Sequence, residues 1–318
     1  LQILQAAALT GIGLTHLPVL YTYGGLQAQP LAGGQLRFGN SVDAFSDIVA
    51  RSHSAMAALP SDTRIGIAPH SLRATSQPDL RKALDLHAGM PVHMHIAEQT
   101  KEVEEVFAMR GARPVEWVLG QCEVNEKWCL IHATHMTEGE TAALAKSGAV
   151  AGLCPITEAN LGDGIFNGAN YVAHGGTFGI GSDSNVNISL TEELRTLEYS
   201  QRLRDRQRNV MVAAAGSVGE ALYFGAARGG AQALDRDAGR IEVGALADLV
   251  AIDTTDPAIC ALSDQQLLDG VVFAAKDTVV SDLWSAGRHQ VRDRSHVAED
   301  KIISGYRKAI TDLRRRLG

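Results

Sequence analysis

Six short apolar segments of strand length recur through the first 184 residues, and amphipathic stretches separate most of them. Near-continuous apolar strands that alternate with helices are typical of a parallel sheet covered on both faces. The expected strands span residues 11–21, 64–72, 91–98, 128–135, 149–155 and 177–184, and the expected helices span 42–58, 77–86, 101–109, 138–146 and 191–202. A barrel of strand–helix units is the leading candidate for the fold.

A closed barrel of this kind has eight strands, and only six are visible here. The chain also opens on what reads as the end of a helix running into a strand, without an initiator Met. If the fold is a barrel, we expect its first two strands to precede residue 1. The chain is then expected to be a fragment of a longer protein.

The pattern changes after a helical stretch over residues 217–234. Residues 239–253 and 271–291 alternate at period two, which predicts antiparallel strands. The last residues form an amphipathic helix whose arginines lie near its end, where they complement the helix dipole. We therefore expect a partial barrel with strands three to eight over 1–237, a small β unit over 238–293 and a C-terminal helix over 294–318.

Composition narrows the classes of partner. The formal net charge is −7 without a basic stripe, so we expect no nucleic-acid partner. There is no apolar run of membrane-spanning length and no signal-peptide pattern, which favours a cytoplasmic protein that does not bind membranes. The cysteines form no CxxC pair and are expected to be reduced thiols: Cys122, Cys129, Cys154 and Cys260.

Polar residues follow several of the expected strands. His93 and His95 stand two apart, so they share one face of a strand, and Glu98 follows as the chain leaves it. The other strands end in a similar way, with His70 and Arg73, His132 and His135, and Asp183. A lone strand histidine is more often a hydrogen-bonded core residue than a ligand. Polar residues at the same end of consecutive parallel strands are what a shared site would produce.

These residue types suit a metal site with a proton-transfer group beside it. Neutral imidazole nitrogens bind a divalent metal, and a nearby carboxylate can move protons to and from water. Glu158, Asn160 and Asp163 follow the 149–155 strand in what reads as a loop. They could line the site, but capping and turn roles explain them equally well.

The motifs resemble those of the amidohydrolase superfamily of metal-dependent (β/α) barrels, and within it the branch that acts on N-formimino-L-glutamate. The similarity runs over nearly the whole chain and is most specific at residues 66–74, 95–105, 111–119, 132–137, 152–166 and 179–186. The stretch GALADLVAID over 244–253 is similar to the closing β-sandwich segment of the superfamily. The resemblance implies a (β/α)8 TIM-type barrel that hydrolyses the formimino C–N bond of this anionic glutamate derivative, releasing ammonia, in histidine degradation.

The resemblance also implies roles for individual residues. His95 and Asp183 match metal ligands, and the expected cofactor is one divalent metal, Zn²⁺. Glu98 and Asp183 match the groups that shuttle protons, and His132 matches a catalytic histidine that contacts the attacking water or the intermediate. His70 and Arg73 match positions that hold the substrate; Arg73 suits a bidentate grip on a carboxylate, with a surface salt bridge as the alternative.

One departure from the superfamily pattern is plain. The superfamily's first strand carries an HxH pair that completes the metal site, and the only HxH here is His93 and His95. As given, the chain is expected to bind metal poorly and to be inactive. Two other functions stay open: a related aminohydrolase acting on a purine or pyrimidine, and a non-catalytic barrel used as a scaffold. A homodimer is also open, because homodimers are common in the superfamily.

Overall fold

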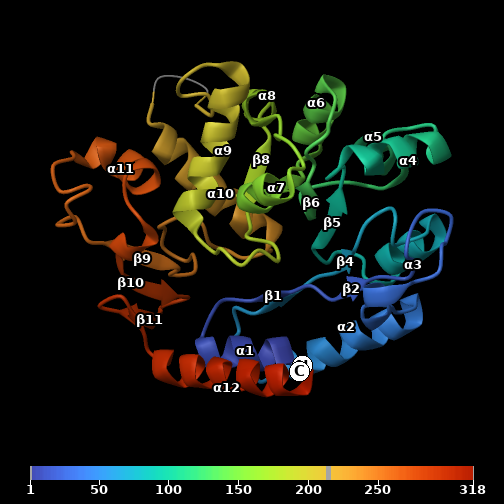
Figure 1. Ribbon diagram of the computed structural model, residues 1–318, viewed down its shortest axis with the longest axis horizontal. Coiled ribbons are helices and arrows are strands. Elements are labelled where there is room, and N and C mark those ends of the chain that lie inside the picture. The colour runs from blue at the N-terminus through green and yellow to red at the C-terminus, as the bar shows by residue number, and fades with distance from the viewer. Residues whose placement is uncertain (1, 213–215, 318) are drawn as a thin grey trace.

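Six consecutive parallel strand positions organise the larger part of the molecule (Figure 1). The computed structural model describes residues 2–212 and 216–317. Its parallel strands are β1 (Thr15–His16), β2 (Val19–Leu20), β3 (Arg64–Ile65), β4 (Ala68–Pro69), β5 (Val92–Ile96), β6 (Trp128–His132), β7 (Val150–Leu153) and β8 (Thr177–Ile180). All six expected strand segments are therefore present, although the first two are each broken into a pair of short strands.

The parallel strands are neighbours in chain order. β5, β6, β7 and β8 form one four-stranded sheet, while β1 pairs with β3 and β2 pairs with β4. A single bridge between Ile67 and Val92 joins the earlier strands to β5. The Ala68 N–H also donates to the Pro18 carbonyl, so the ladder continues across the breaks. In the described part of the chain, no ladder joins β8 to β1, so the strands form an open series.

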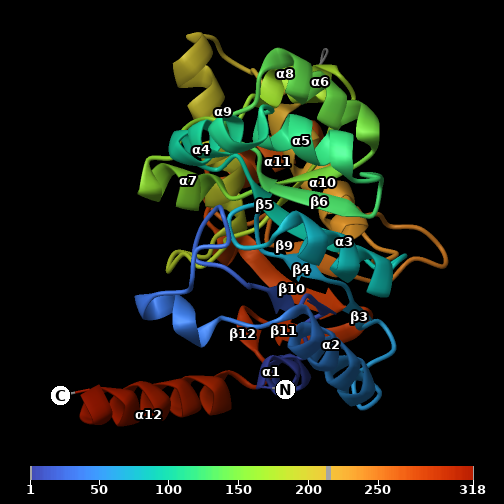
Figure 2. The same ribbon diagram turned by 90° about the vertical axis from the view of Figure 1, so that its right-hand side faces the viewer.

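The helices that follow these strands cover the outer face of the sheet (Figures 1 and 2). They are α2 (Val42–Met56), α3 (Gln77–Leu86), α4 (Thr100–Arg110), α5 (Pro114–Gln121), α6 (Glu138–Ser147), α7 (Pro155–Leu161), α8 (Gly168–Ala173), α9 (Leu190–Asp205) and α10 (Val218–Ala233), and α1 (Gln2–Thr10) precedes β1. Local chemistry sets their bounds. Thr137 and Glu140 form a capping box at the start of α6, and Gly148 ends it at φ +82°.

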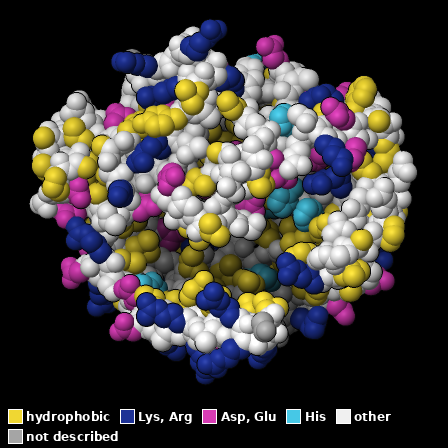
Figure 3. All heavy atoms as spheres, in the orientation of Figure 1, with side chains coloured by type: hydrophobic (Ala, Val, Ile, Leu, Met, Phe, Trp, Pro, Cys, Tyr) yellow, Lys and Arg dark blue, Asp and Glu magenta, His cyan; other side chains and the backbone are white. Residues whose placement is uncertain are grey.

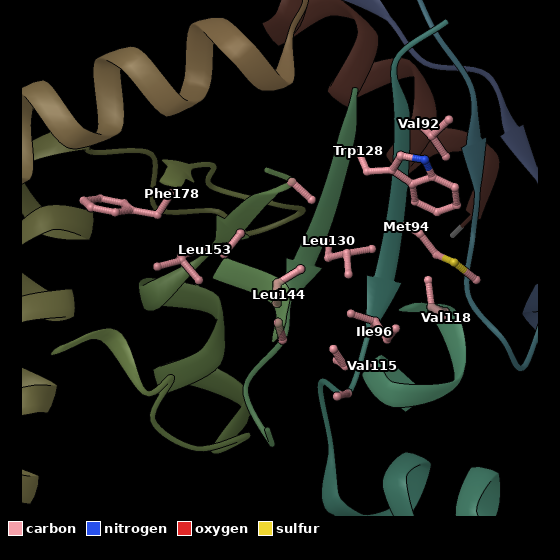
Figure 4. Close-up of a cluster of buried hydrophobic side chains, with 14 of the residues drawn as sticks. Val92, Met94, Ile96, Val115, Val118, Trp128, Leu130, Leu144, Leu153 and Phe178 are labelled. Carbon is pink, nitrogen blue, oxygen red and sulfur yellow. The ribbon is translucent and has the colours of Figure 1, made fainter. Parts of the chain in front are cut away.

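The main hydrophobic core lies between the sheet and these helices (Figure 4). On β5, Val92, Met94 and Ile96 are buried against that layer. Each such side chain stabilises the fold by about 1.5–3 kcal/mol relative to its exposed state. Because side chains alternate along a strand, His93 and His95 point to the opposite face, as the sequence predicted.

Helix α10 approaches β8 very closely. A Cβ atom added at Gly229 would lie 1.9 Å from the carbonyl oxygen of Phe178, whereas one added at Gly230 would meet nothing within 4 Å. Gly229 therefore permits direct contact between the backbones of the helix and the strand.

The C-terminal part contains a small antiparallel sheet in the order β12-β11-β10-β9, formed by β9 (Leu249–Ile252), β10 (Val280–Ser285), β11 (Arg288–Arg292) and β12 (Ser295–His296). The expectation of strand from residue 271 onward is wrong at its start, because α11 (Leu267–Phe273) is helical. Val271 and Val272 are buried on this helix. The prediction was wrong there because a short apolar run fits a strand and a buried helix equally well.

The last described element is α12 (Glu299–Leu317), which begins later than the helix expected from residue 294, because Ser295 and His296 form β12. Among the described residues, no helix is long and apolar enough to cross a membrane.

Candidate active site

Three of the predicted histidines lie in one row at the carboxyl ends of neighbouring strands. The rings of His70 and His95 stack with centroids 4.8 Å apart, and those of His95 and His132 lie 5.5 Å apart. His70 directly follows β4, His95 lies in β5 and His132 ends β6. Parallel strands in register bring these positions to the same edge.

The side chains of two predicted acidic residues lie next to His132. Its Nε2 lies 3.9 Å from Glu98 Oε1 and 3.9 Å from Asp183 Oδ2. The side chain is fully buried, yet Nε2 has no hydrogen-bond partner among the described residues. On the other side of the ring, Nδ1 lies 3.2 Å from Glu158 Oε1. The structure therefore brings together Glu98, His132 and Asp183, which follow three different strands.

The backbone turns sharply where these side chains are placed. Ala97, His132, Ala133 and Asp183 all have left-handed conformations, with φ between +48° and +68°. Such conformations cost about 1–3 kcal/mol at residues other than glycine, and they concentrate at functional sites. The turns direct His132 and Asp183 toward each other at the strand ends.

His95 and Asp183 line the same cavity, which has a volume of about 260 Å³. His93 lines it as well, but its Nε2 lies 2.7 Å from the Ala233 carbonyl oxygen, so this nitrogen is engaged inside the fold. Figure 3 shows that this face of the molecule is hollowed at its centre, with histidine and acidic side chains beside the hollow.

Burial and neighbouring charges set different protonation preferences within the row. Burial, together with the charges of His95 and Arg73, lowers the pKa of His70 to about 3. Burial also lowers the pKa of His95 and raises that of Glu98. For His132, burial alone would lower the pKa, but the Glu158 hydrogen bond and the nearby carboxylates outweigh it and raise the pKa.

Arg73 lies beside this cluster but opens onto a second cavity. That cavity has a volume of about 540 Å³ and is also lined by Gln99, Glu102 and Gly25. The Arg73 Nε is buried without a hydrogen-bond partner in the part of the chain that the structure describes. The guanidinium is therefore not committed to a surface salt bridge, which was the alternative for this residue.

Two buried glutamates lie at the site: Glu158, for which a place in the site was one of two open interpretations, and Glu102, which the sequence did not single out. Glu158 was expected in a loop, but it lies in α7, and its Oε1 also accepts a hydrogen bond from the Cys154 N–H. Pro155 at the helix start and Gly162 after its end are the signals that could have predicted this helix. Glu102 on α4 accepts hydrogen bonds from the N–H groups of Ala97 and Glu98. It thereby holds the segment that carries Glu98.

Of the remaining predicted candidates, His135 and Asp163 lie beside each other in the fold. His135 Nε2 lies 2.7 Å from the Asp163 carbonyl oxygen, and Gln99 donates to Asp163 Oδ1. Asn160 lies in α7, where a loop was expected, and Asp163 follows the end of that helix.

Across residues 2–212 and 216–317, no three His, Cys, Asp or Glu side chains are arranged to hold a metal ion by themselves. The described residues offer His95 and Asp183 as a pair beside His132, which is fewer than the three or more protein ligands of a catalytic zinc site.

Comparisons with known proteins identify the family of this chain. The model of the amidohydrolase family matches residues 47–289. Formimidoylglutamate deiminase of Pseudomonas aeruginosa is 44% identical over 315 residues, which cover 98% of this chain and 69% of that protein. The 5-methylthioadenosine/S-adenosylhomocysteine deaminase of Natronomonas pharaonis is 32% identical over 73% of this chain and 53% of its own length.

Two solved structures have the same fold. An amidohydrolase from Brucella melitensis aligns with a TM-score of 0.93 at 44% identity, over 98% of this chain and 69% of that one. An adenosine deaminase from Xanthomonas campestris, crystallised with zinc, aligns with a TM-score of 0.81 at 23% identity over 98% of this chain and 68% of that one. The resemblance predicted from the motifs is confirmed, and the chain belongs to the amidohydrolase family of hydrolases.

Proposed function

We propose that the protein to which this chain belongs hydrolyses N-formimino-L-glutamate to N-formyl-L-glutamate and ammonia. The observation that carries the proposal is the convergence on the unpaired, buried Nε2 of His132, which lies 3.9 Å from both Glu98 and Asp183. The 44% identity to formimidoylglutamate deiminase supports the choice of substrate.

The residues present fit a divalent metal. His95 Nδ1 lies 3.1 Å from the His70 carbonyl oxygen, so Nδ1 carries the proton and Nε2 keeps a lone pair for a ligand. Because burial lowers the pKa of His95, its imidazole is neutral, as a ligand must be. His95 and Asp183 would hold the ion, which when bound supplies a water whose pKa is lowered to about 7.

Further ligands must then come from outside the described residues, in agreement with the share of the relatives that this chain covers. A closed eight-stranded barrel, in which two more strands stand between β8 and β1, would provide them.

The chain's own carboxylates divide the proton transfers. In this proposal Asp183 accepts a proton from the attacking water as its oxygen bonds to the formimino carbon. Glu98, whose pKa burial raises, delivers a proton to the amino nitrogen so that it leaves as ammonia. His132, whose raised pKa favours the protonated imidazolium, would donate its Nε2–H to the same place and stabilise the charge that develops on the oxygen. One water is consumed: its oxygen forms the new C=O bond, the C=N bond of the formimino group is broken, and both of its protons end, through Asp183 and Glu98, on the nitrogen that leaves as ammonia.

Arg73 would hold a carboxylate of the glutamate part. Its guanidinium lines the neighbouring cavity, and its Nε has no partner there among the described residues. A planar guanidinium binds a carboxylate through two parallel hydrogen bonds, which a lysine cannot reproduce. This arrangement favours an anionic, acyclic substrate over a purine, the alternative suggested by the more distant deaminase relatives.

The test is ammonia release by the product of the full reading frame. We expect turnover of N-formimino-L-glutamate and none of adenosine. Glu98→Gln should lower kcat by about 10²–10⁴-fold, and Arg73→Ala should chiefly raise KM, with only partial rescue by Arg73→Lys. Full activity of Arg73→Ala on formiminoglutamate, or faster turnover of adenosine, would refute the proposal.

A further inference from the structure

A third cavity, the two-arginine cavity, lies next to the one that Arg73 opens onto and shares Arg73 with it. It has a volume of about 360 Å³. Its charged lining residues are Arg73 and Arg110, and no Asp or Glu among the described residues lines it. A cleft lined by charge of one sign concentrates ions of the opposite sign. The cavity is therefore suited to an anion.

The walls of the two-arginine cavity come from three consecutive strand–helix units. The loop over residues 23–28 follows β2, residues 72–77 follow β4 and lead into α3, and the end of α4 forms the third wall. Figure 1 shows α3 and α4 on the same side of the molecule. The Tyr23 N–H donates to the Ala74 carbonyl oxygen, which joins the first wall to the second. Contacts within the described residues thus set the arrangement of these walls.

The two guanidinium groups keep unused hydrogen-bond donors. The Nε atoms of Arg73 and Arg110 are both buried and have no hydrogen-bond partner in the part of the chain that the structure describes. The guanidinium carbon of Arg110 lies 4.0 Å from the centre of the Trp117 ring, which holds this group in place. A buried donor that has lost its water and gained no acceptor is costly, so an acceptor is expected beside it.

The acidic residues nearby are engaged elsewhere. Glu102 and Glu105 line the neighbouring cavity with Arg73. Glu102 accepts hydrogen bonds from two backbone N–H groups, and Glu105 Oε1 lies 3.7 Å from the ammonium group of Lys101. The charge of the two-arginine cavity is therefore not balanced from within its own lining.

A third polar group without a partner indicates what kind of anion fits. Thr75 lines the same cavity and is 2% exposed, and its buried Oγ1 has no partner among the described residues. Guanidinium groups are donors only, and a hydroxyl can donate as well. A carboxylate or a phosphate carries several acceptor oxygens, and a planar guanidinium binds either of them through two parallel hydrogen bonds.

We propose that the two-arginine cavity binds a small oxyanion between Arg73 and Arg110, with the Thr75 hydroxyl as a further donor. The source of the oxyanion is a carboxylate compound or inorganic phosphate. The site shares only Arg73 with the machinery of the proposed function. Binding itself does not depend on that function, but one consequence does: an oxyanion held here competes with the substrate carboxylate for Arg73.

Isothermal titration calorimetry of the product of the full reading frame tests the site without any turnover. Acetate and inorganic phosphate are titrated separately at constant ionic strength, and the anion that binds more tightly identifies the source. Arg110→Gln should weaken binding by at least about tenfold, because a charge-assisted pair of hydrogen bonds is lost. Thr75→Val, which keeps the shape of the side chain, should weaken it by a smaller factor. The control is Arg81→Gln on α3, which removes an exposed arginine from a different cavity and should leave binding unchanged.

Ammonia release tests the competition for Arg73. The tighter-binding anion should raise KM of the wild type without lowering kcat. Arg110→Gln should keep both constants in the absence of the anion and lose most of this inhibition. If the protein does not turn over N-formimino-L-glutamate, the proposed function fails, and the calorimetry still decides whether the site exists.

Three results would overturn the proposal. One is a wild type that binds neither acetate nor phosphate. Another is binding that Arg110→Gln and Arg81→Gln weaken equally, since this would show an adventitious ion only. The third is binding that Arg73→Gln abolishes and Arg110→Gln leaves unchanged, which would place the anion in the substrate site alone. Circular dichroism of each variant checks that the fold is kept.

Discussion

Glu193 tests whether the electrostatics of the strand-end cluster are understood. This carboxyl group on α9 is 2% exposed. One oxygen accepts a hydrogen bond from the Ile156 N–H at 2.8 Å, and the other has no partner among the described residues. Burial, followed by the charges of Glu158, Glu192 and Asp183, raises its pKa from 4.5 to about 7. Glu193→Gln keeps the volume and the acceptor for Ile156 but removes the ionisation.

The sign follows from proton linkage. Between pH 4.5 and 7 the folded state binds more protons at Glu193 than the unfolded state, so the free energy of unfolding falls as the pH rises through this window. Above pH 7 the ionised group costs about 3 kcal/mol relative to pH 4. Glu193→Gln should therefore be more stable than wild type by up to about 3 kcal/mol at pH 8, and nearly equal to it at pH 4.5.

The assay is urea denaturation of both proteins at intervals between pH 4.5 and 8, from which the difference in unfolding free energy is plotted against pH. Titrating groups that do not interact with Glu193 contribute equally to both proteins and cancel. A difference that does not change with pH, or a wild type that is the more stable protein at pH 8, would refute the reasoning.

Gly229→Ala should destabilise the fold by at least about 2 kcal/mol, because the added Cβ forces α10 away from β8. Gly230→Ala is the neighbouring control and should be neutral or slightly stabilising. Thermal unfolding of the two variants measures the difference. Glu158→Gln should keep the proton on Nδ1 of His132, because its amide oxygen can still accept it, and Glu158→Leu should lose this preference. The ¹⁵N shifts of the ring report which nitrogens are protonated, and identical spectra would contradict the assignment. Asp62→Asn removes the carboxylate that pairs with two arginines and should cost about 3 kcal/mol at pH 7. Because the arginine hydrogen bonds lower the pKa of Asp62, that cost should fade only as the pH drops below 3.8, which acid-to-neutral denaturation series would show.

The strand positions and the residues at their ends could be predicted because one physical constraint fixes both. Apolar alternation on β5 sends Met94 to the core and His95 to the other face, and parallel pairing brings His95, His132 and Asp183 to one edge. No comparable constraint governs Glu158. It reaches His132 only because α7 turns back over the strand end, which depends on tertiary packing.

Two further features lay beyond the sequence pattern for related reasons. Val271 and Val272 sit in an apolar run too short to distinguish a strand from a buried helix, so α11 was expected as a strand. The separate cavity of Arg73 depends on how the segment around Gly25 folds over α4, which no local periodicity encodes.

The central claim is that His95 and Asp183 serve one metal beside Glu98 and His132. Zinc content of the product of the full reading frame, measured by mass spectrometry after dialysis, tests it most directly. We expect close to one equivalent in wild type and in His135→Ala, whose imidazole is engaged with the Asp163 carbonyl. His95→Ala and Asp183→Ala should each lose most of that zinc, and an unchanged zinc content in both would contradict the claim.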